Sequence, residues 1–302
     1  MDASLLVVSY NTAGLLEQCL RSAALHYPEA EVVVVDNASR DGSAAMVRRE
    51  FPGVALVESG GNVGFAAANN LALRHSRGEA IVLLNSDTIL EDDSLRRCVA
   101  YLEAHPGVGA LSPRLVGVDG VDQQALHRVS TLSYELGVAA RRPGPPPTGP
   151  GAGDDGLWWL AGTALVVRRR AAEGAGGLLD EGYWMYWEDA DLSARLRRAG
   201  WELAYLPEAH VVHHGGASSG GPGGARPSLV AWYLYGRHRY YGKHRPRAER
   251  LGLWLLEASG VPRGYARGLL RPAGRPEHWV MAGGYAANLA RVLLGRSPAR
   301  PA

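Results

Sequence analysis

Residues 81–88 read Ile-Val-Leu-Leu-Asn-Ser-Asp-Thr, a short apolar run that ends abruptly in polar residues. Such a run predicts a buried strand. Strands of α/β sheets meet their ligands at their carboxyl ends, where a rigidly held carboxylate can bind a divalent cation and, through it, a diphosphate. Asp87 is therefore a candidate cation ligand. The alternative is that Asp87 caps a helix that begins near residues 92–93.

The segments around this strand predict an α/β fold with a doubly wound, mostly parallel sheet. Apolar runs predict strands at residues 4–10, 31–35, 54–57 and 80–84. Helical spacing of apolar residues predicts helices that begin at Thr12 and that cover residues 43–50, 65–75 and 94–104. Regular alternation of strand and helix is typical of parallel sheets with helices on both faces.

The pattern is less regular after residue 105. Strands are expected at residues 109–116, 157–167, 201–206 and 209–212, with an amphipathic helix that ends at Gly200. Composition rich in Pro, Gly or Ser predicts mobile segments at 141–156 and 215–227. Further helices are expected at 232–241, 251–256 and 279–294. We therefore predict one domain over residues 1–216 and a helical extension over residues 217–302.

Charge is distributed unevenly along the 302 residues, whose formal net charge is only +2. From Arg226 onward there are 14 Lys or Arg and three acidic residues, a balance of +11, so residues 1–225 carry −9. A basic, aromatic-rich extension suggests either nucleic acid or an anionic membrane surface. No nucleic-acid recognition motif occurs, so we expect no nucleic-acid partner and favour peripheral membrane contact. A solvated helical cap is the alternative.

The sequence shows neither a signal peptide nor a membrane-spanning segment, which bears on the cellular compartment in which we expect the protein. The N-terminal residues do not show the basic and apolar pattern of a signal peptide, and no run of ~18 apolar residues could span a bilayer. Cys19 and Cys98 lie in apolar helical patterns and are expected to be buried free thiols. We expect a cytoplasmic protein, with peripheral attachment to the inner face of the membrane as a further option.

Four predicted strands end in polar clusters, which should converge because the carboxyl ends of parallel strands share one edge. The clusters are Tyr10-Asn11, Asp36-Asn37, Asn62 with Gly64, and Asn85-Ser86-Asp87. The first strand is not followed by the Gly-x-Gly-x-x-Gly of dinucleotide-binding folds, and no Walker-type phosphate loop occurs. A metal ion is then the simplest way to hold phosphates. Asx turns and a glycine turn at 60–64 are the alternative reading of these clusters.

These segments resemble family 2 of the nucleotide-diphospho-sugar glycosyltransferases, whose fold is called GT-A. The resemblance covers residues 4–216 and rests on VVSYN at 7–11, VVDNAS at 34–39, NVGFAAANN at 62–70, LLNSD at 83–87, EDADL at 188–192 and HHGG at 213–216. It implies a nucleotide-binding half at 1–105 and an acceptor half at 106–216. The rhamnosyltransferase-like branch is the most similar, which implies transfer from a dTDP-sugar to a glycan or lipid-linked glycan.

The resemblance implies a set of residues that bind the donor nucleotide-sugar. They are Ser9, Tyr10, Asn11, Asp36, Asn37, Gly64, Asn69 (or Asn70), Asn85, Ser86 and Asp87. Gly64 would let the chain approach the nucleotide, and the amides at 69 and 70 would reach donor hydroxyls or instead face solvent. Asp87 matches the last position of an Asp-x-Asp motif and would bind Mg²⁺ or Mn²⁺. Asn85 in the first position lowers the charge of the site, so His213, with His214 as the alternative, is expected to complete it and to favour Mn²⁺.

The resemblance also implies the catalytic base and the acceptor side. Asp189 would remove the proton of the acceptor hydroxyl in an inverting transfer, although it could also simply start a helix. The acceptor residues would be Gly162, Thr163, Trp184, Glu188 and Asp191. Two other functions remain open. A sugar nucleotidyltransferase has a similar sheet but usually begins with a Gly-rich basic loop, and a glycan-binding module would not need the base.

Overall fold

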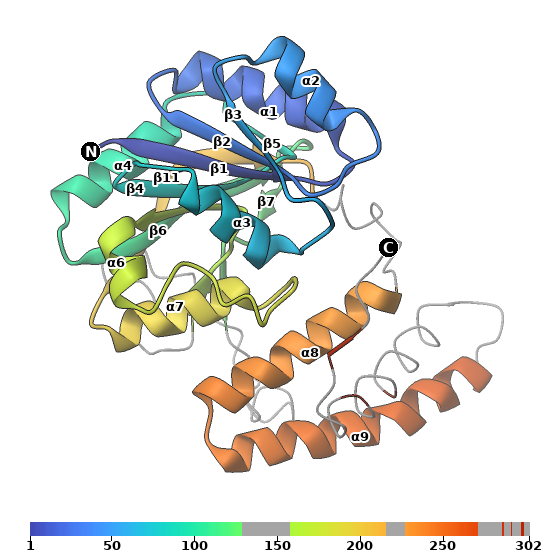
Figure 1. The fold of residues 1–302 in the computed structure, drawn as a ribbon. Helices are drawn as coiled ribbons and strands as arrows, with labels where there is room; N and C mark the ends of the chain where they lie inside the picture. Colours follow the sequence, from blue (N-terminus) through green and yellow to red (C-terminus); the bar gives the residue numbers. More distant parts are fainter. Residues whose placement is uncertain (129–157, 216–226, 271–285, 287–290, 292–296, 299–302) are drawn as a thin grey trace. The chain divides into compact units, whose positions relative to one another are not determined.

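Residues 80–85 form β4 (Ala80–Asn85), a buried strand of the main sheet in this computed structural model (Figure 1). The structure describes residues 1–128, 158–215, 227–270, 286, 291 and 297–298. The predicted mobile segment 141–156 lies outside these residues, as do nearly all of 215–227 and of the helix predicted at 279–294.

The first half of the sheet is parallel, as its alternating pattern predicts. Its strands are β1 (Ala3–Ser9), β2 (Glu31–Asp36), β3 (Ala55–Glu58) and β4. The helices between them are α1 (Ala13–His26), α2 (Ser43–Glu50) and α3 (Phe65–Arg74). In Figure 1, α1 and α2 lie on one side of these strands and α3 on the other. The chain reverses its direction across the sheet between β3 and β4, which creates the crevice where such folds bind ligands.

The second half adds strands of both directions. They are β5 (Thr88–Ile89), β6 (Val108–Gly117), β7 (Asp122–Gln123), β10 (Ala164–Arg168) and β11 (Glu202–His213). Among the described residues the main sheet has the order β3-β2-β1-β4-β10-β6-β11-β5, with β7 paired to β6. β1 to β4, β6 and β11 run in one direction, whereas β5, β7 and β10 oppose them. The sheet is therefore mostly parallel.

Two strand predictions in this half need correction. Residues 157–167 are not one strand, because a turn at Gly162 and Thr163 separates β9 (Trp158–Leu160) from β10. β9 pairs with β8 (Leu126–Arg128) in a separate two-stranded sheet, and a continuous apolar run does not reveal that change of partner. Conversely, 201–206 and 209–212 belong to one strand, β11, whose register shifts around Pro207. Proline has no N–H for the ladder, so a bulge accommodates it.

The remaining helices of this part are α4 (Ser94–Ala104), α6 (Arg169–Gly174) and α7 (Glu188–Arg198). α4 packs against β6 and β11, and α7 packs against β9 and β11. The core between sheet and helices is mainly apolar, with Leu5, Val34 and Leu83 completely buried. Cys19 and Cys98 are buried and free, as predicted.

The chain divides into two units, which we describe separately. The first comprises Met1–Val129, Pro143–Trp184 and Glu188–Ser218, and the second takes in most of the rest with α8 (Pro227–His244) and α9 (Arg247–Leu270). In the second unit the buried Glu257 of α9 accepts a hydrogen bond from His238 of α8 at 2.6 Å and pairs with Arg237. Among the described residues, no helix is long and apolar enough to cross a bilayer. The proposed boundary at residue 216 stays a prediction.

Candidate active site

The polar strand ends lie side by side, as the sequence predicts. In the parallel register of β1 with its two neighbours, Ser9 is paired with Asp36 and Val8 with Asn85. The turn of Ser86 and Asp87 follows directly on β4. The carboxyl ends of three adjacent strands therefore bring their polar residues to one edge of the sheet.

Buried hydroxyl groups join the first of these strand ends to the last. The Thr12 hydroxyl lies 3.0 Å from that of Ser9 and 2.9 Å from that of Ser86. All three side chains are buried. The sequence indicated Thr12 only as the start of a helix, but the structure shows that its side chain connects β1 to the turn that carries Asp87.

Asp36 offers an unsatisfied hydrogen-bond acceptor. Its Oδ2 accepts the backbone N–H of Ser39 at 3.1 Å, which is the turn expected of an Asx residue. Its Oδ1 is buried and has no hydrogen-bond partner among the described residues. A buried acceptor without a partner is unfavourable, so this oxygen is well suited to receive an N–H or O–H from a ligand.

Neighbouring Asn37 is held differently, because its amide is used within the protein. Its oxygen accepts the N–H of Val63 at 2.9 Å, and its nitrogen donates to Asn62 at 3.1 Å. Asn11, by contrast, is exposed in a left-handed conformation and accepts the N–H of Arg40 at 2.7 Å. Asn37 thus holds the loop before α3, while Asn11 and the partly exposed Tyr10 lie at the surface beside it.

Gly64 adopts a backbone conformation and a close packing contact that favour glycine. It has φ +90°, and a Cβ atom there would lie 2.3 Å from the carbonyl oxygen of Trp184. The N–H of Phe65 donates to the same oxygen at 2.7 Å. The structure therefore places the chain at Trp184, which is itself buried, against Gly64, and the approach of a nucleotide to Gly64 stays a prediction.

The two amides of α3 are also engaged within the protein. Asn69 is 1% exposed and donates to the carbonyl of Phe65 at 3.0 Å. Asn70 donates to the carbonyl of Leu179 at 2.8 Å and accepts the N–H of the same residue at 3.1 Å. Neither amide faces solvent as a free group, and their contact with donor hydroxyls stays a prediction that this arrangement does not favour.

Asp87 and His213 come together as the sequence predicts. The antiparallel pairing of β5 with β11 places His213 opposite Thr88, and His213 Nε2 lies 3.3 Å from Asp87 Oδ1. His214 instead donates its backbone N–H to the carbonyl of Asp87 at 2.9 Å. Asp87 caps no helix, because α4 begins at Ser94, whose N–H is bound by Asp92 at 2.8 Å. The capping alternative is therefore wrong.

The chemistry of this pair fits a divalent cation. A buried carboxylate oxygen from the turn after β4 and an imidazole nitrogen from β11 approach each other, and mixed oxygen and nitrogen ligation suits Mn²⁺. Within the described residues, no group of three or more His, Cys, Asp or Glu side chains could hold a metal ion. A cation at Asp87 and His213 would therefore take its other ligands from a diphosphate or water.

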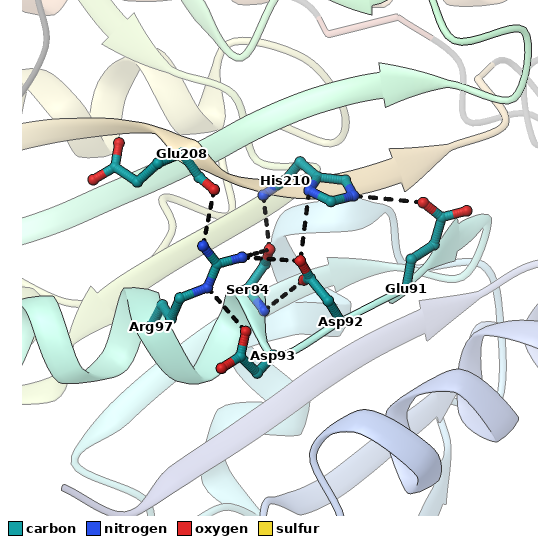
Figure 2. A network of polar contacts seen from close by, with 7 residues as sticks. All are labelled: Glu91, Asp92, Asp93, Ser94, Arg97, Glu208 and His210. Atoms are coloured by element: carbon teal, nitrogen blue, oxygen red, sulfur yellow. Dashed lines mark hydrogen bonds and ion pairs between the residues drawn. The ribbon is translucent and has the colours of Figure 1, made fainter.

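A surface network connects the segment after β5 to β11, the strand that carries His213. Figure 2 shows that Arg97 of α4 binds Asp92 at 2.9 Å and the carbonyl of Glu208 at 3.0 Å. The backbone N–H of His210 donates to Ser94 at 2.9 Å, and the His210 ring lies 3.4 Å from Glu91. Because these bonds join the segment after β5 to β11, they fix the register that sets Asp87 against His213.

Asp189 lies in the first turn of α7, with both carboxylate oxygens bound by backbone N–H groups. Oδ2 accepts from Gly162 at 3.0 Å and Oδ1 from Ala190 at 2.8 Å. Burial raises the pKa of Asp189 to about 6, while these hydrogen bonds oppose the increase. The turn at Gly162 and Thr163 also binds β4, because Asn85 at the end of β4 donates its N–H to the carbonyl of Thr163 at 2.9 Å. This turn therefore connects Asp189 to β4. A carboxylate with this pKa can act as a general base near neutral pH.

The two acidic neighbours of Asp189 differ in character. Glu188 is buried with Oε2 unpartnered among the described residues, and burial with the nearby Asp189 charge raises its pKa well above the ordinary value. Asp191 is fully buried and accepts from Arg195 at 2.7 Å, and Arg195 also donates to the Gly177 carbonyl at 2.6 Å. Asp191 thus anchors a loop, and its role as an acceptor contact stays a prediction that this geometry does not favour.

Comparison with known proteins gives a consistent family. Residues 4–173 match the family model described as Glycosyl transferase family 2. An N-acetylglucosaminyl-diphospho-decaprenol L-rhamnosyltransferase of Mycobacterium tuberculosis is 30% identical over 239 residues, which are 70% of this chain and 76% of that protein. Rhamnosyltransferase WbbL of Escherichia coli is 25% identical over 264 residues, which are 82% of this chain and 95% of that protein.

Solved structures share the fold at lower identity. The mannosyltransferase PcManGT from Pyrobaculum calidifontis, in complex with GDP-Man and Mn²⁺, has a TM-score of 0.57 and 21% identity, covering 98% of this chain and 88% of that one. GalNAc-T7 with UDP, GalNAc and Mn²⁺ has a TM-score of 0.56 and 14% identity, covering 80% of this chain and 48% of that one. The predicted GT-A-type α/β fold is confirmed.

Proposed function

Because the chain belongs to glycosyl transferase family 2, we propose that it is an inverting, metal-dependent hexosyltransferase that uses a nucleotide-diphospho-sugar. The observation that carries this proposal is the Gly162–Thr163 turn. The N–H of Gly162 binds Asp189, and the carbonyl of Thr163 accepts the N–H of Asn85 at the end of β4. One turn therefore connects this carboxylate to the strand that leads into Asp87, which lies against His213. A transfer reaction needs these two elements, a base for the acceptor and a charged site for the leaving diphosphate.

Each site residue has a distinct role in the proposed reaction. Asp36 Oδ1 accepts a hydrogen bond from the nucleoside, which satisfies the buried oxygen. Asp87 and His213 would hold Mn²⁺ or Mg²⁺, and a bound cation would neutralise charge on the diphosphate. Asp189 takes the proton of the acceptor hydroxyl as that oxygen bonds to the anomeric carbon. The bond from this carbon to the diphosphate breaks on the opposite face, which inverts the configuration.

We propose L-rhamnose from dTDP-rhamnose as the transferred sugar, with a glycan or lipid-linked glycan as acceptor. The support is the description of the relatives from M. tuberculosis and E. coli as rhamnosyltransferases, the former acting on a diphospho-decaprenol. The fold alone does not support rhamnose as the transferred sugar, because the solved structures with a similar fold are bound to other sugars or sugar donors.

Donor binding can be measured without knowing the acceptor. In a thermal-shift screen of nucleotide-sugars we expect dTDP-rhamnose with Mn²⁺ to raise Tm by about 4–6 °C at ~100 times Kd, since such saturation stabilises by about 2.7 kcal/mol. Asp36→Ala should reduce the shift. The proposal fails if no nucleotide-sugar raises Tm, with or without the cation, while a shift by a different nucleotide-sugar would replace only the donor.

We further propose that α9 contacts an anionic membrane surface. Leu251 and Leu255, one helical turn apart, are 61% and 64% exposed, and Arg247 and Arg250 lie exposed beside them. The acidic Glu249 is paired with Arg245 at 3.2 Å, so it does not offset these charges. Apolar side chains with adjacent Arg are the combination that binds helices to anionic bilayers.

Vesicle sedimentation tests this surface. We expect binding to vesicles that contain anionic lipid and weaker binding to neutral ones, because each basic residue near such a surface contributes about 1 kcal/mol. Arg247→Glu with Arg250→Glu should weaken binding at least ~30-fold. The matched control reverses the same charge at Arg48 and Arg49, which lie exposed on α2. Equal loss in both double variants would show a dependence on net charge alone.

The pH dependence of kcat/KM should report Asp189. Because its pKa is raised to about 6, the base is ionised above that pH, and kcat/KM should fall about tenfold per pH unit below it. A raised carboxyl pKa also means that Asp189 favours the folded state more as pH falls from 6 toward its ordinary value. Activity lost near pH 5 should therefore return on neutralisation. An acid limb near pH 4 would exclude this assignment.

A further inference from the structure

Gln123 reaches His213 across the end of β6. Gln123 belongs to β7 and is paired with Leu115 of β6, whereas His213 of β11 is paired with Gly117 of β6. A Cβ atom on Gly117 would lie 3.3 Å from Gln123 Nε2, tighter than most such contacts. The lack of a side chain at Gly117 therefore leaves room for the Gln123 amide to cross β6.

The Gln123 amide makes two hydrogen bonds with His213. The first identifies the amide nitrogen and oxygen, and so determines which atom donates in the second. Gln123 Nε2 donates to the backbone carbonyl of His213 at 3.0 Å. A carbonyl oxygen can only accept, so this bond fixes which end of the amide is nitrogen. Gln123 Oε1 then lies 2.7 Å from His213 Nδ1. Because an amide oxygen can only accept, Nδ1 must carry the proton.

The position of that proton decides what the other ring nitrogen can do. In a neutral imidazole with the proton on Nδ1, Nε2 has a lone pair. His213 Nε2 faces Asp87 Oδ1 at 3.3 Å, so two acceptors face each other. A cation shared by both atoms removes this repulsion. With the proton on Nε2 instead, the ring would donate to Asp87, and one hydrogen bond would occupy both ligands.

We propose that Gln123 is a positioning residue that holds His213 in the Nδ1–H tautomer and thereby keeps Nε2 open to a divalent cation such as Mn²⁺. The inference rests on the metal site of the proposed function, but the tautomer can be measured without metal. Hydrogen-bond partners behind metal-binding histidines typically change metal affinity 10- to 100-fold when they are removed.

Two measurements on the full chain test the proposal. ¹⁵N NMR of the metal-free protein at about pH 8 should show the proton of His213 on Nδ1, and Gln123→Leu should move it wholly or partly to Nε2. Mn²⁺ titration followed by EPR should show 10- to 100-fold weaker binding in Gln123→Leu. The control is Gln124→Leu, the same change at the exposed neighbouring residue. Thermal unfolding in EDTA checks that both variants fold.

Each result has a definite meaning. A proton on Nε2 in the wild-type protein overturns the proposal, as does unchanged Mn²⁺ affinity in a folded Gln123→Leu variant. If the wild-type protein binds no Mn²⁺ but carries the proton on Nδ1, the metal site of the proposed function fails, while the control of the tautomer by Gln123 is supported. In the active enzyme, excess Mn²⁺ should restore most of the turnover of Gln123→Leu, which a misfolded variant would not show.

Discussion

Asp189→Asn should lower kcat by about 10²- to 10⁴-fold, the usual contribution of a general base. The amide cannot take a proton from the acceptor hydroxyl, but its oxygen can still accept the N–H of Gly162, which now binds Oδ2 at 3.0 Å. Asp36, Asp87 and His213 are unchanged in this variant. We therefore expect the donor to raise Tm as much as in the wild-type protein.

The loss of kcat in Asp189→Asn must be compared with its ability to bind the donor, because only a catalytic base should affect the first and not the second. Steady-state kcat and the thermal shift by donor with Mn²⁺ should be measured on the same preparation. Asp2→Asn serves as control, since it makes the same change at an exposed carboxylate. If Asp189→Asn retains more than about a tenth of kcat, another group accepts the proton and the assignment of the base is wrong.

Asp87→Asn should lower kcat by about 10²- to 10³-fold, comparable to the loss of one group that stabilises a developing oxyanion. Asn85 is uncharged, so Asp87 supplies the negative charge of the ligand pair with His213. The amide preserves shape but binds a hard cation much less well. The backbone bond from His214 to the carbonyl of residue 87 does not depend on the side chain and should keep the turn in place.

Titration with Mn²⁺ separates this role from a structural one. The wild-type protein should lose activity in EDTA and regain it with Mn²⁺, whereas Asp87→Asn should bind Mn²⁺ weakly and respond little to it. Unfolding in urea should show similar stability for both proteins. A wild-type enzyme that is fully active in EDTA would contradict the metal-dependent mechanism and leave the family membership untouched.

Local sequence patterns predicted much of this molecule because they depend on neighbouring residues. The alternation of strands and helices, the convergence of strand ends and the pairing of Asp87 with His213 follow from periodicity, parallel-sheet geometry and a family motif. Patterns of this kind describe what a segment forms and which end carries polar groups.

Features that depend on distant partners could not be predicted in this way. Gly64 is required by Trp184, 120 positions later, and Thr12 is bound to Ser86, 74 positions later. The same limit explains Asn37, since a short motif identifies an amide but not whether protein or ligand will use it. Gln123 has no motif, because its role depends on the crossing of β6 at Gly117.

The turn at Gly162 and Thr163 makes its two key bonds with peptide groups, an N–H toward Asp189 and a carbonyl toward Asn85. The connection between Asp189 and β4 is therefore independent of the side chain at residue 163. Substitutions of the Thr163 side chain can therefore accumulate while the turn keeps its bonds to Asp189 and Asn85. A laboratory selection for new acceptors would do well to begin with randomisation of Thr163 and with Gly162 and Asp189 kept constant.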